Sequence, residues 1–499
     1  MAAKSRINLN AIMKITGLLM VIEGFFMLSS LGFSAWYDPD CLDHLRLFDP
    51  RHDFLPLLVS GSGVGFLGLL FWTFNKKLDQ NSIGKREGYI IVSLTWVIIS
   101  FFGAIPFVLS GITTSYTDAF FETMSGFTTT GATIFADIEA LPKGILFWRS
   151  MTHWIGGMGI IVLSLAILPI LGIGGMQLFV AEVPGLTPDK LHPRITQTAK
   201  RLWIIYVMLT LIQTLLLMLG GMNLFESLCH AFGTMATGGF STRNDSIAGF
   251  SPYIQYVIIL FMYLAGISFT LHYFVIKRQF RKVLRNEELR MYTLLLITAT
   301  VTIAAALFYM QHLESGKAFR DALFQVVSIV TTTGYITSDY LTWPFFTWLL
   351  IFLLMFTGGC AGSTGGGIKI VRIILLFKNS RMELKRIVHP QALLPVRLNG
   401  KSISQQIIFN VLAFFLIYII IFAFGSLVMS AMGMEFESAV GAVAASLGNI
   451  GPGLGSVGPV LNYSTVPMAG KWVLAFLMLL GRLELFTVLI LFSASFWKK

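Results

Sequence analysis

The sequence reads Thr332-Thr333-Gly334-Tyr335 between two long apolar runs, and related phrases occur at three other places in the chain. These phrases are Thr129-Thr130-Gly131-Ala132, Ala236-Thr237-Gly238-Gly239 and Asn449-Ile450-Gly451-Pro452. Their central glycines lie 107, 96 and 117 residues apart, which indicates a fourfold internal repeat. Four such loops from one chain can surround one axis, where a ring of carbonyl oxygens can replace the water around an ion.

The composition is that of a protein embedded in a membrane. Of its 499 residues, 55% are hydrophobic and only 12% are charged, about half the charged fraction of a soluble protein. Apolar runs of about 20 residues, each long enough to cross a bilayer, recur along the chain. The composition therefore predicts an all-α membrane protein with no separate soluble domain. We expect no cleavable signal peptide, because the first apolar run, which starts after Lys14, is too long for one.

The apolar runs predict ten transmembrane helices and four shorter re-entrant pore helices. The predicted spans are 15–36, 55–74, 89–110, 146–172, 202–221, 254–276, 291–310, 344–376, 404–430 and 470–497. The predicted re-entrant helices are 117–130, 225–237, 320–333 and 436–448. Non-helical backbone at membrane depth is tolerated only where it is buried or lines a water-filled cavity.

The positive charges predict the orientation. With both termini in the cytoplasm, 27 of the 36 Lys and Arg residues fall on the inner side and eight, including Arg149, on the outer side. The one remaining residue of this count, Arg482, is assigned to the inside of a span. The net charge of +11 then faces the anionic inner leaflet and cytosolic partners, so we do not interpret it as nucleic-acid binding.

The repeats divide the chain into an N-terminal part and four units in pseudo-fourfold arrangement. We expect a two-helix hairpin over 1–75, followed by span–pore loop–span repeats at 88–175, 200–280, 290–378 and 403–499. The longer cytoplasmic connections between these units carry most of the charge and are natural docking surfaces.

The four phrases have the chemistry of a potassium selectivity filter. Backbone carbonyls are neutral dipoles that bind K⁺ without trapping it, and glycine lets successive carbonyls point inward because it enters φ > 0 freely. The predicted filter comprises Thr129, Thr130, Gly131, Ala236, Thr237, Gly238, Thr332, Thr333, Gly334, Asn449, Ile450 and Gly451. We expect K⁺ at Thr130, Gly131, Thr237, Gly238, Thr333, Gly334, Ile450 and Gly451. For any single loop, a helix bend or small-residue packing is the alternative.

Acidic residues near the outer ends of the spans form a second candidate feature. They are Asp118, Glu122, Glu226, Asp321, Glu435 and Glu437. These carboxylates could concentrate cations at the mouth of a pore, or they could be ordinary solvated or helix-capping residues.

A glycine-rich stretch interrupts the predicted span 344–376. Six glycines occur in the ten residues 358–367, which cannot hold a stable helix. We predict a flexible gate below the filter, formed by Gly358, Gly359, Gly362, Gly365, Gly366, Gly367 and Arg482. The alternatives are a static kink or a phosphate-binding loop, but no Ser or Thr follows Lys369 as a P-loop requires.

Arg482 is costly at membrane depth and is a functional candidate by default. It could reach the carbonyls of the glycine-rich stretch and form a cationic barrier, or it could form a structural salt bridge with Glu484 or another acidic residue. For His153 and His230 we expect packing roles. The cysteines, Cys41, Cys229 and Cys360, have no paired spacing and are expected to be unlinked. No Ser/His/Asp or paired-carboxylate arrangement indicates an enzyme.

The phrases and their surroundings resemble the Trk family of potassium-uptake membrane subunits (TrkH type, within the Trk/Ktr/HKT superfamily). The matching stretches are 120–133, 154–159, 236–242, 331–335, 358–369, 447–454 and 481–486. The resemblance implies a K⁺-selective pore with Gly131, Gly238, Gly334 and Gly451 in its filter, a gating loop at 358–367 and Arg482 facing that loop. It further implies a homodimer in the bacterial inner membrane, controlled by a cytosolic nucleotide-binding (TrkA-like) gating ring, with potassium as substrate and no covalently bound cofactor.

Three functions remain open from the sequence. The first is gated potassium uptake driven by the membrane potential. The second is an ion-coupled secondary transporter (K⁺/H⁺ or K⁺/Na⁺ symport), although such folds usually show two inverted repeats rather than four units that all begin inside. The third is a non-transporting membrane scaffold or sensor, which leaves the four glycine phrases unexplained.

Overall fold

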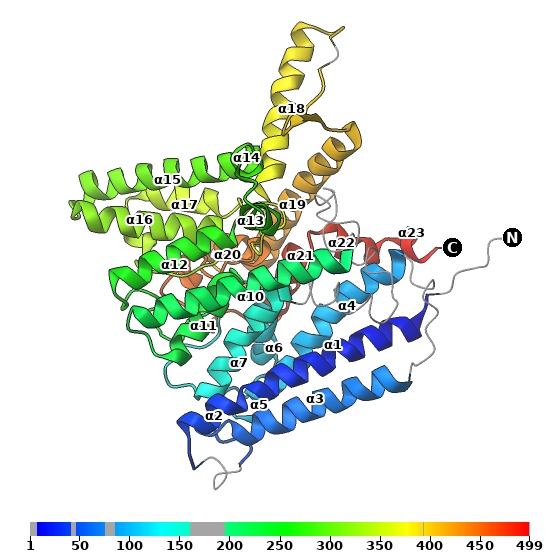
Figure 1. Ribbon diagram of the computed structural model, residues 1–499, viewed down its shortest axis with the longest axis vertical. Helices are drawn as coiled ribbons and strands as arrows, with labels where there is room; N and C mark the ends of the chain where they lie inside the picture. Colours follow the sequence, from blue (N-terminus) through cyan, green and yellow to red (C-terminus); the bar gives the residue numbers. More distant parts are fainter. Residues whose placement is uncertain (1–6, 41–45, 75–84, 160–194, 393, 499) are drawn as a thin grey trace, which may run out of the picture.

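The computed structural model describes residues 7–40, 46–74, 85–159, 195–392 and 394–498. These residues form an all-helical protein apart from one short antiparallel pair, β1 (Arg397–Leu398) and β2 (Lys401–Ser402), in which Arg397 lies opposite Ser402. Figure 1 shows long helices that lie roughly side by side, with short helices and loops between them. The predicted all-α membrane fold is therefore observed.

The described helices occur in the following order along the chain. The first are α1 (Leu9–Ser29), α2 (Leu31–Tyr37) and α3 (Phe54–Phe74). Next come α4 (Lys85–Gly103), α5 (Ile105–Leu109), α6 (Tyr116–Phe127), α7 (Lys143–Trp154) and the π-helix η1 (Ile155–Gly159). They are followed by α10 (Ile195–Leu219), α11 (Leu224–Met235), α12 (Pro252–Ala265), α13 (Phe269–Ile276) and α14 (Phe280–Leu284).

The second half of the chain repeats this pattern. It contains α15 (Glu287–Gln311), α16 (Ser315–Val330), the 3₁₀ turn η2 (Tyr340–Thr342), α17 (Phe345–Leu354) and α18 (Ile370–Val388). The last elements are α19 (Gln405–Ala431), α20 (Phe436–Gly448), η3 (Gly455–Val457), α21 (Met468–Arg482), α22 (Phe486–Leu489), η4 (Ile490–Phe492) and α23 (Ala494–Trp497).

Several helices can cross a bilayer by length and composition. Within the described ranges, six helices qualify, and the number rises to eight if each of two bent pairs is one span. The pairs are Pro252–Ala265 with Phe269–Ile276, bent by 100°, and Met468–Arg482 with Phe486–Phe492, bent by 110°. The total of ten remains a prediction, and the predicted span 146–172 leaves the described residues at 160.

Four short helices lie where the sequence predicts re-entrant segments. These are α6, α11, α16 and α20, with 12, 12, 16 and 13 residues. At 1.5 Å per residue they are about 18–24 Å long, which is less than the roughly 30 Å hydrocarbon core of a bilayer. Each of them ends at one of the four glycine phrases.

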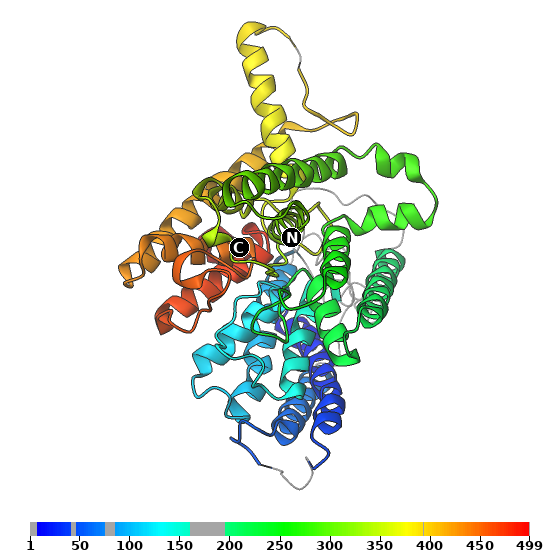
Figure 2. The same ribbon diagram turned by 90° about the vertical axis from the view of Figure 1, so that its left-hand side faces the viewer.

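The predicted interruption of the span 344–376 is present. Helix α17 ends at Leu354 and α18 begins at Ile370, so the glycine-rich stretch lies between them as irregular backbone. Helix α18 projects from the rest of the protein, together with the β1–β2 pair, in the views of Figure 1 and Figure 2.

Helices α1 and α3 pack closely because glycines lie at their contact (Figure 1). A Cβ atom on Gly24 would lie 2.6 Å from the carbonyl oxygen of Gly61, and one on Gly17 would lie 2.7 Å from that of Gly68. Small residues at such contacts let two helix backbones approach closely in a membrane.

We predict that Gly24→Ala lowers the stability of the protein by about 1–3 kcal/mol, because the new methyl group overlaps backbone that cannot move aside. The control is Gly63→Ala on α3, where a Cβ atom would meet nothing within 4 Å. Alanine is also the better helix former, so thermal denaturation of the purified protein should show no loss for this control. Equal melting temperatures for both variants would contradict the packing argument.

Candidate functional site

The four glycine phrases have the same backbone shape. Each phrase has one residue in a left-handed conformation at or just after the helix cap, with φ of 52° at Thr129, 55° at Thr237, 61° at Thr332 and 54° at Asn449. In the first three units this residue follows the C-cap, and in the fourth unit Asn449 is itself the C-cap. The next residue donates its N–H to the carbonyl five residues earlier, and this distance is 2.8 Å in all four units. The four bonds are Thr130 to Ser125, Gly238 to Gly233, Thr333 to Ser328 and Ile450 to Ala445.

This backbone shape corrects the alignment of the second unit. The residue two positions after the left-handed one is Gly131, Gly334 or Gly451 in three units, but it is Gly239 in the second. Sequence comparison placed Gly238 in the central position, one residue too early, because Gly238 and Gly239 look alike in a linear alignment. Ala236, predicted to be part of the filter, is instead the cap of α11. We call 129–131, 237–239, 332–334 and 449–451 the central segments.

Three threonines occupy a backbone conformation that β-branched residues rarely adopt. Thr129, Thr237 and Thr332 are all left-handed and fully buried. Such residues cost on the order of 1–3 kcal/mol each, persist only where their surroundings impose the conformation, and cluster at functional sites. Because the same backbone strain occurs in three units, the central segments are a candidate functional site.

The central segments meet one another in a closed ring. A Cβ atom on Gly131 would overlap the carbonyl oxygen of Gly238, and one on Gly239 would overlap that of Thr333. On Gly334, a Cβ atom would lie 2.8 Å from the nitrogen of Gly451, and on Gly451 it would lie 2.9 Å from the carbonyl oxygen of Gly131. Each segment thus touches the next, and the fourth touches the first.

A second set of contacts links the same neighbours just beyond the central segments. Arg149 Nη1 donates to the Ser241 carbonyl (3.0 Å), and Ile247 N donates to the Ile336 carbonyl (3.0 Å). The ring is completed by the Tyr340 hydroxyl to the Gly453 carbonyl and by Tyr463 N to the Thr133 carbonyl, both at 2.8 Å. The four units are therefore arranged cyclically, in chain order, around the central segments.

The threonine side chains are hydrogen-bonded inside the protein. The hydroxyls of Thr130 and Thr333 lie 2.8 Å from those of Thr128 and Thr331, respectively. Asn449 Nδ2 also donates to Thr130 Oγ1 (3.1 Å). These hydrogen bonds brace the segments from the side.

The glycine-rich stretch lies directly against the inner ends of the short helices. Gly366 N donates to Thr332 Oγ1 at 2.7 Å, and the Thr364 hydroxyl donates to the Met235 carbonyl at 3.0 Å. A Cβ atom on Gly366 would lie 2.7 Å from the carbonyl oxygen of Gly448. The stretch therefore contacts the second, third and fourth units at the same depth.

Arg482 connects this stretch to the first unit. Its Nη1 donates to the Thr364 carbonyl, and its Nη2 donates to the carbonyls of Gly156 and Gly157, each at 2.7 Å. The predicted reach of Arg482 to the glycine-rich stretch is thus observed. Glu484, its alternative partner, forms an ion pair with Arg372.

The N-terminal half of the glycine-rich stretch is held by groups on neighbouring helices. Glu288 at the start of α15 accepts hydrogen bonds from Ala361 N (2.7 Å) and Val371 N (3.1 Å). The Gly266 carbonyl accepts from Cys360 N at 2.8 Å. The chain is thus held at residues 360 and 361 and again at Val371 in α18, and residues 364–366 between these points contact the short helices.

Most of the carboxylates predicted near the outer ends form ion pairs or lie at the start of a helix. Asp118 pairs with Lys471 (2.6 Å), and Glu226 pairs with Arg243 (2.9 Å). Asp118, Glu226 and Glu437 lie in the first turns of their helices, where a negative charge complements the helix dipole. Glu435 is the N-cap residue of α20, and Asp321 is buried.

Two charge assignments differ from the sequence-based expectation. Glu122, expected near the mouth, is 1% exposed, and Arg149, counted as an outer charge, is also 1% exposed. They form a buried ion pair of 2.6 Å between Glu122 Oε1 and Arg149 Nε. The pairing of two charges from separate helices is invisible to a count of loop charges.

The histidines have packing contacts. His153 stacks on the Phe240 ring with centroids 3.9 Å apart, and His230 contacts the Glu226 carbonyl and the Ser241 hydroxyl at 2.7 and 3.0 Å. Across the described part of the chain, no group of three or more His, Cys, Asp or Glu side chains could hold a metal ion. Cys229 and Cys360 are free and buried, and Cys41 lies outside the described residues.

Three residues of the site were missed by sequence reasoning. Gly239 was passed over for its neighbour, Arg149 was treated as a surface charge, and Glu288 was not singled out. Arg149 carried a usable signal, because it lies within a predicted apolar span. Glu288 carried none, since it stands beside Glu287 at a helix start, where acidic residues are common.

The chain matches known proteins over most of its length. The TrkH family model, described as a cation transport protein, matches residues 66–499. The chain is 44% identical over 438 residues to the Trk system potassium uptake protein TrkH of Escherichia coli K12, covering 87% of this chain and 90% of that protein. It is 39% identical to the protein of the same name from Halomonas elongata, covering 99% and 100%.

The fold also matches a solved structure. The crystal structure of the potassium transporter TrkH from Vibrio parahaemolyticus superimposes with a TM-score of 0.86 at 37% identity. The match covers 98% of this chain and 100% of that chain.

Proposed function

The chain belongs to the TrkH family of cation transport proteins, and from that premise we propose that it conducts potassium into the cell through a gated, carbonyl-lined filter. The closed ring of four central segments carries this proposal. The family is one of transport proteins rather than enzymes, and its named relatives are potassium uptake proteins.

The filter consists of the carbonyl oxygens of the central segments. Segments in contact around a ring direct their carbonyls at a common axis, and neutral dipoles can replace the hydration shell of K⁺. The four short helices end at the ring, so the partial negative charge of each carboxyl end favours a cation there. With the corrected alignment, the filter positions are the left-handed residue and the two that follow in each segment, including Gly239.

The gate is the middle of the glycine-rich stretch with Arg482. Residues 364–366 contact the second, third and fourth units below the ring, and Arg482 joins them to the first unit. A guanidinium at this depth repels a cation leaving the filter. Moving the stretch away from the short helices would open the path, and Glu288 would then act as one of its anchors.

The finer architecture is also part of the proposal. We infer ten transmembrane spans with α6, α11, α16 and α20 as re-entrant pore helices, since these four are too short to cross a bilayer. Both termini lie in the cytoplasm of a cell whose inner membrane holds the protein, as the excess of inner Lys and Arg indicates. The projecting α18 and β1–β2 pair offer a charged surface to a second copy of the chain and to a cytosolic nucleotide-binding ring.

A membrane potential suffices to drive uptake. Each 100 mV contributes about 2.3 kcal/mol per charge, enough to accumulate K⁺ several-tens-fold. Reversal potentials of the purified protein in liposomes test this function directly. They should follow the K⁺ gradient and ignore a pH or Na⁺ gradient, whereas dependence on either co-ion would favour a symporter instead.

We predict that Gly239→Ala reduces the K⁺/Na⁺ permeability ratio by about tenfold, which corresponds to about 1.4 kcal/mol. Gly239 has φ of 80°, and its new Cβ atom would displace the Thr333 carbonyl. The matched control is Gly221→Ala, which places the same strain at φ of 97° but meets nothing within 4 Å. Liposome flux with each ion measures the ratio, and an unchanged ratio for Gly239→Ala would remove this residue from the filter.

We further predict that Arg482→Gln raises K⁺ flux about tenfold in liposomes that contain no cytosolic partner, because a barrier lowered by about 1.4 kcal/mol has this effect. The control is Arg381→Gln, which removes an exposed charge from α18. A flux that stays at the wild-type level in Arg482→Gln would contradict the gate.

A further inference from the structure

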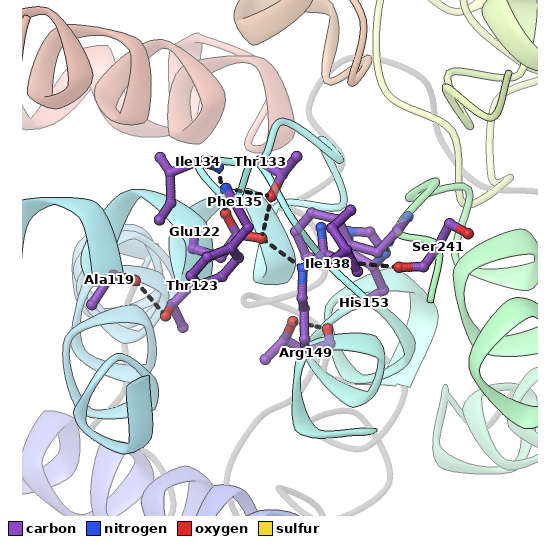
Figure 3. Close-up of polar contacts among 12 residues, drawn as sticks. Ala119, Glu122, Thr123, Thr133, Ile134, Phe135, Ile138, Arg149, His153 and Ser241 are labelled. Carbon is purple, nitrogen blue, oxygen red and sulfur yellow. Dashed lines mark hydrogen bonds and ion pairs between the residues drawn. The ribbon is translucent and has the colours of Figure 1, made fainter. Parts of the chain in front are cut away.

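A buried ion pair lies behind the central segments of the first and second units. Glu122 of α6 and Arg149 of α7 have side chains that are only 1% and 2% exposed, and Arg149 Nε donates to Glu122 Oε1 at 2.6 Å. Figure 3 shows Arg149 between Glu122 on one side and Ser241 on the other. The pair therefore connects elements of two different units.

Glu122 holds the chain that leaves the first central segment. Its carboxylate accepts a hydrogen bond from Thr133 Oγ1 at 3.0 Å and another from Ile134 N at 2.8 Å (Figure 3). Thr133 follows Gly131 by two residues. The position of the first segment is therefore linked to the position of this carboxylate.

Arg149 holds the chain that leaves the second central segment. Its Nη1 donates to the Ser241 carbonyl at 3.0 Å, and its guanidinium carbon lies 3.5 Å from the centroid of the Phe240 ring. Phe240 directly follows Gly239 and stacks on His153, whose ring would lie 2.5 Å from a Cβ atom on Gly238. The Arg149 guanidinium thus contacts both the first unit, through Glu122, and the second unit, through Phe240 and Ser241.

The other units place neutral side chains at the position of Glu122. Nine residues before the central glycine, the second, third and fourth units have His230, Gln325 and Ala442. His230 contacts the Ser241 hydroxyl at 3.0 Å, and Gln325 Nε2 donates to the Ser338 carbonyl at 3.2 Å. The same position therefore braces the exit of its own segment in three units, and in the first unit it also binds a guanidinium that reaches the neighbour.

We propose that the Glu122–Arg149 pair determines ion selectivity by setting the distance between the first and second central segments. This inference rests on the proposed filter. Selectivity among monovalent cations depends on the spacing and number of carbonyl dipoles around the ion. The planar guanidinium fork has fixed geometry and can hold Glu122 and Ser241 together, whereas a lysine ammonium is a point charge on a flexible stem.

The pair acts as a positioning device and is not an ion-binding site. Both charges are compensated by each other, so the pair adds little net field at the axis. Its oxygens are also occupied by three donors from the protein. Its effect should therefore appear in the ratio between ions more than in the flux of K⁺ itself.

The test is the K⁺/Na⁺ permeability ratio of Arg149→Lys in liposomes. This variant keeps the buried positive charge beside Glu122 but loses the bridge to Ser241. We expect the ratio to fall about tenfold, equivalent to about 1.4 kcal/mol, while a cooperative melting transition shows that the variant is folded. A ratio equal to that of wild type in the folded variant would overturn the inference.

A second variant covers the case in which Arg149→Lys does not fold. The double substitution Glu122→Gln with Arg149→Gln leaves no uncompensated buried charge, so the fold should persist. This double variant also lacks the guanidinium that joins the first and second units, so the K⁺/Na⁺ permeability ratio should fall by a similar factor. An unchanged ratio in this double variant would overturn the inference equally.

The chain provides a matched control at the outer mouth. Arg243 pairs with Glu226 at 2.9 Å and lies over the Phe250 ring at 4.0 Å, yet its side chain is 36% exposed. Arg243→Lys should leave the ratio unchanged, and a tenfold fall there would show that any arginine loss has this effect and overturn the inference. If the wild-type protein does not discriminate between K⁺ and Na⁺, the proposed function and this inference both fail. If the wild type discriminates and the Arg149 variants have the same ratio, only this inference fails.

Discussion

The four central segments close on one another through contacts between a glycine and the backbone of the next segment. Gly131 and Gly239 have no room for a Cβ atom, because a neighbouring carbonyl oxygen occupies its place. In the fourth segment the requirement is different: Gly451 is not left-handed, but it lies against Gly131. Close approach therefore explains all four glycines, and left-handed backbone explains three of them.

This ring exists only because the surrounding structure holds strained backbone in place. Three buried threonines sit in a left-handed conformation, and asparagine takes the fourth position, where it adopts this conformation more readily than threonine. Hydroxyls of neighbouring threonines and contacts between units stabilise the arrangement. The central segments are therefore held in place by hydrogen bonds from residues that pack behind them.

The glycine-rich stretch also depends on close backbone contacts, which it makes on the inner side of the ring. Its residues contact three units at one depth, so side chains there would separate it from the short helices. The stretch reaches the first unit through Arg482, whose guanidinium donates to three carbonyls.

Much of the fold was readable from the sequence because it rests on local patterns. Apolar runs predicted the long helices, of which six, or eight with the two bent pairs, can cross a bilayer in the described part of the chain. Glycine content predicted the break before α18, and recurrence of a short phrase pointed to the segments that meet in the ring. The relatives and the matching structure support potassium transport, as the same residues indicated.

Other features were decided only by the tertiary structure. Gly239 takes the central position because a carbonyl from the third unit lies against it, and no linear comparison contains that carbonyl. Glu122 and Arg149 pair across 27 residues of chain, and Arg149 then reaches the second unit. Sequence encodes what each segment tends to form by itself. Register and charge pairing depend instead on which surfaces meet, because close contacts between residues far apart in the chain select one arrangement from several that are locally equivalent.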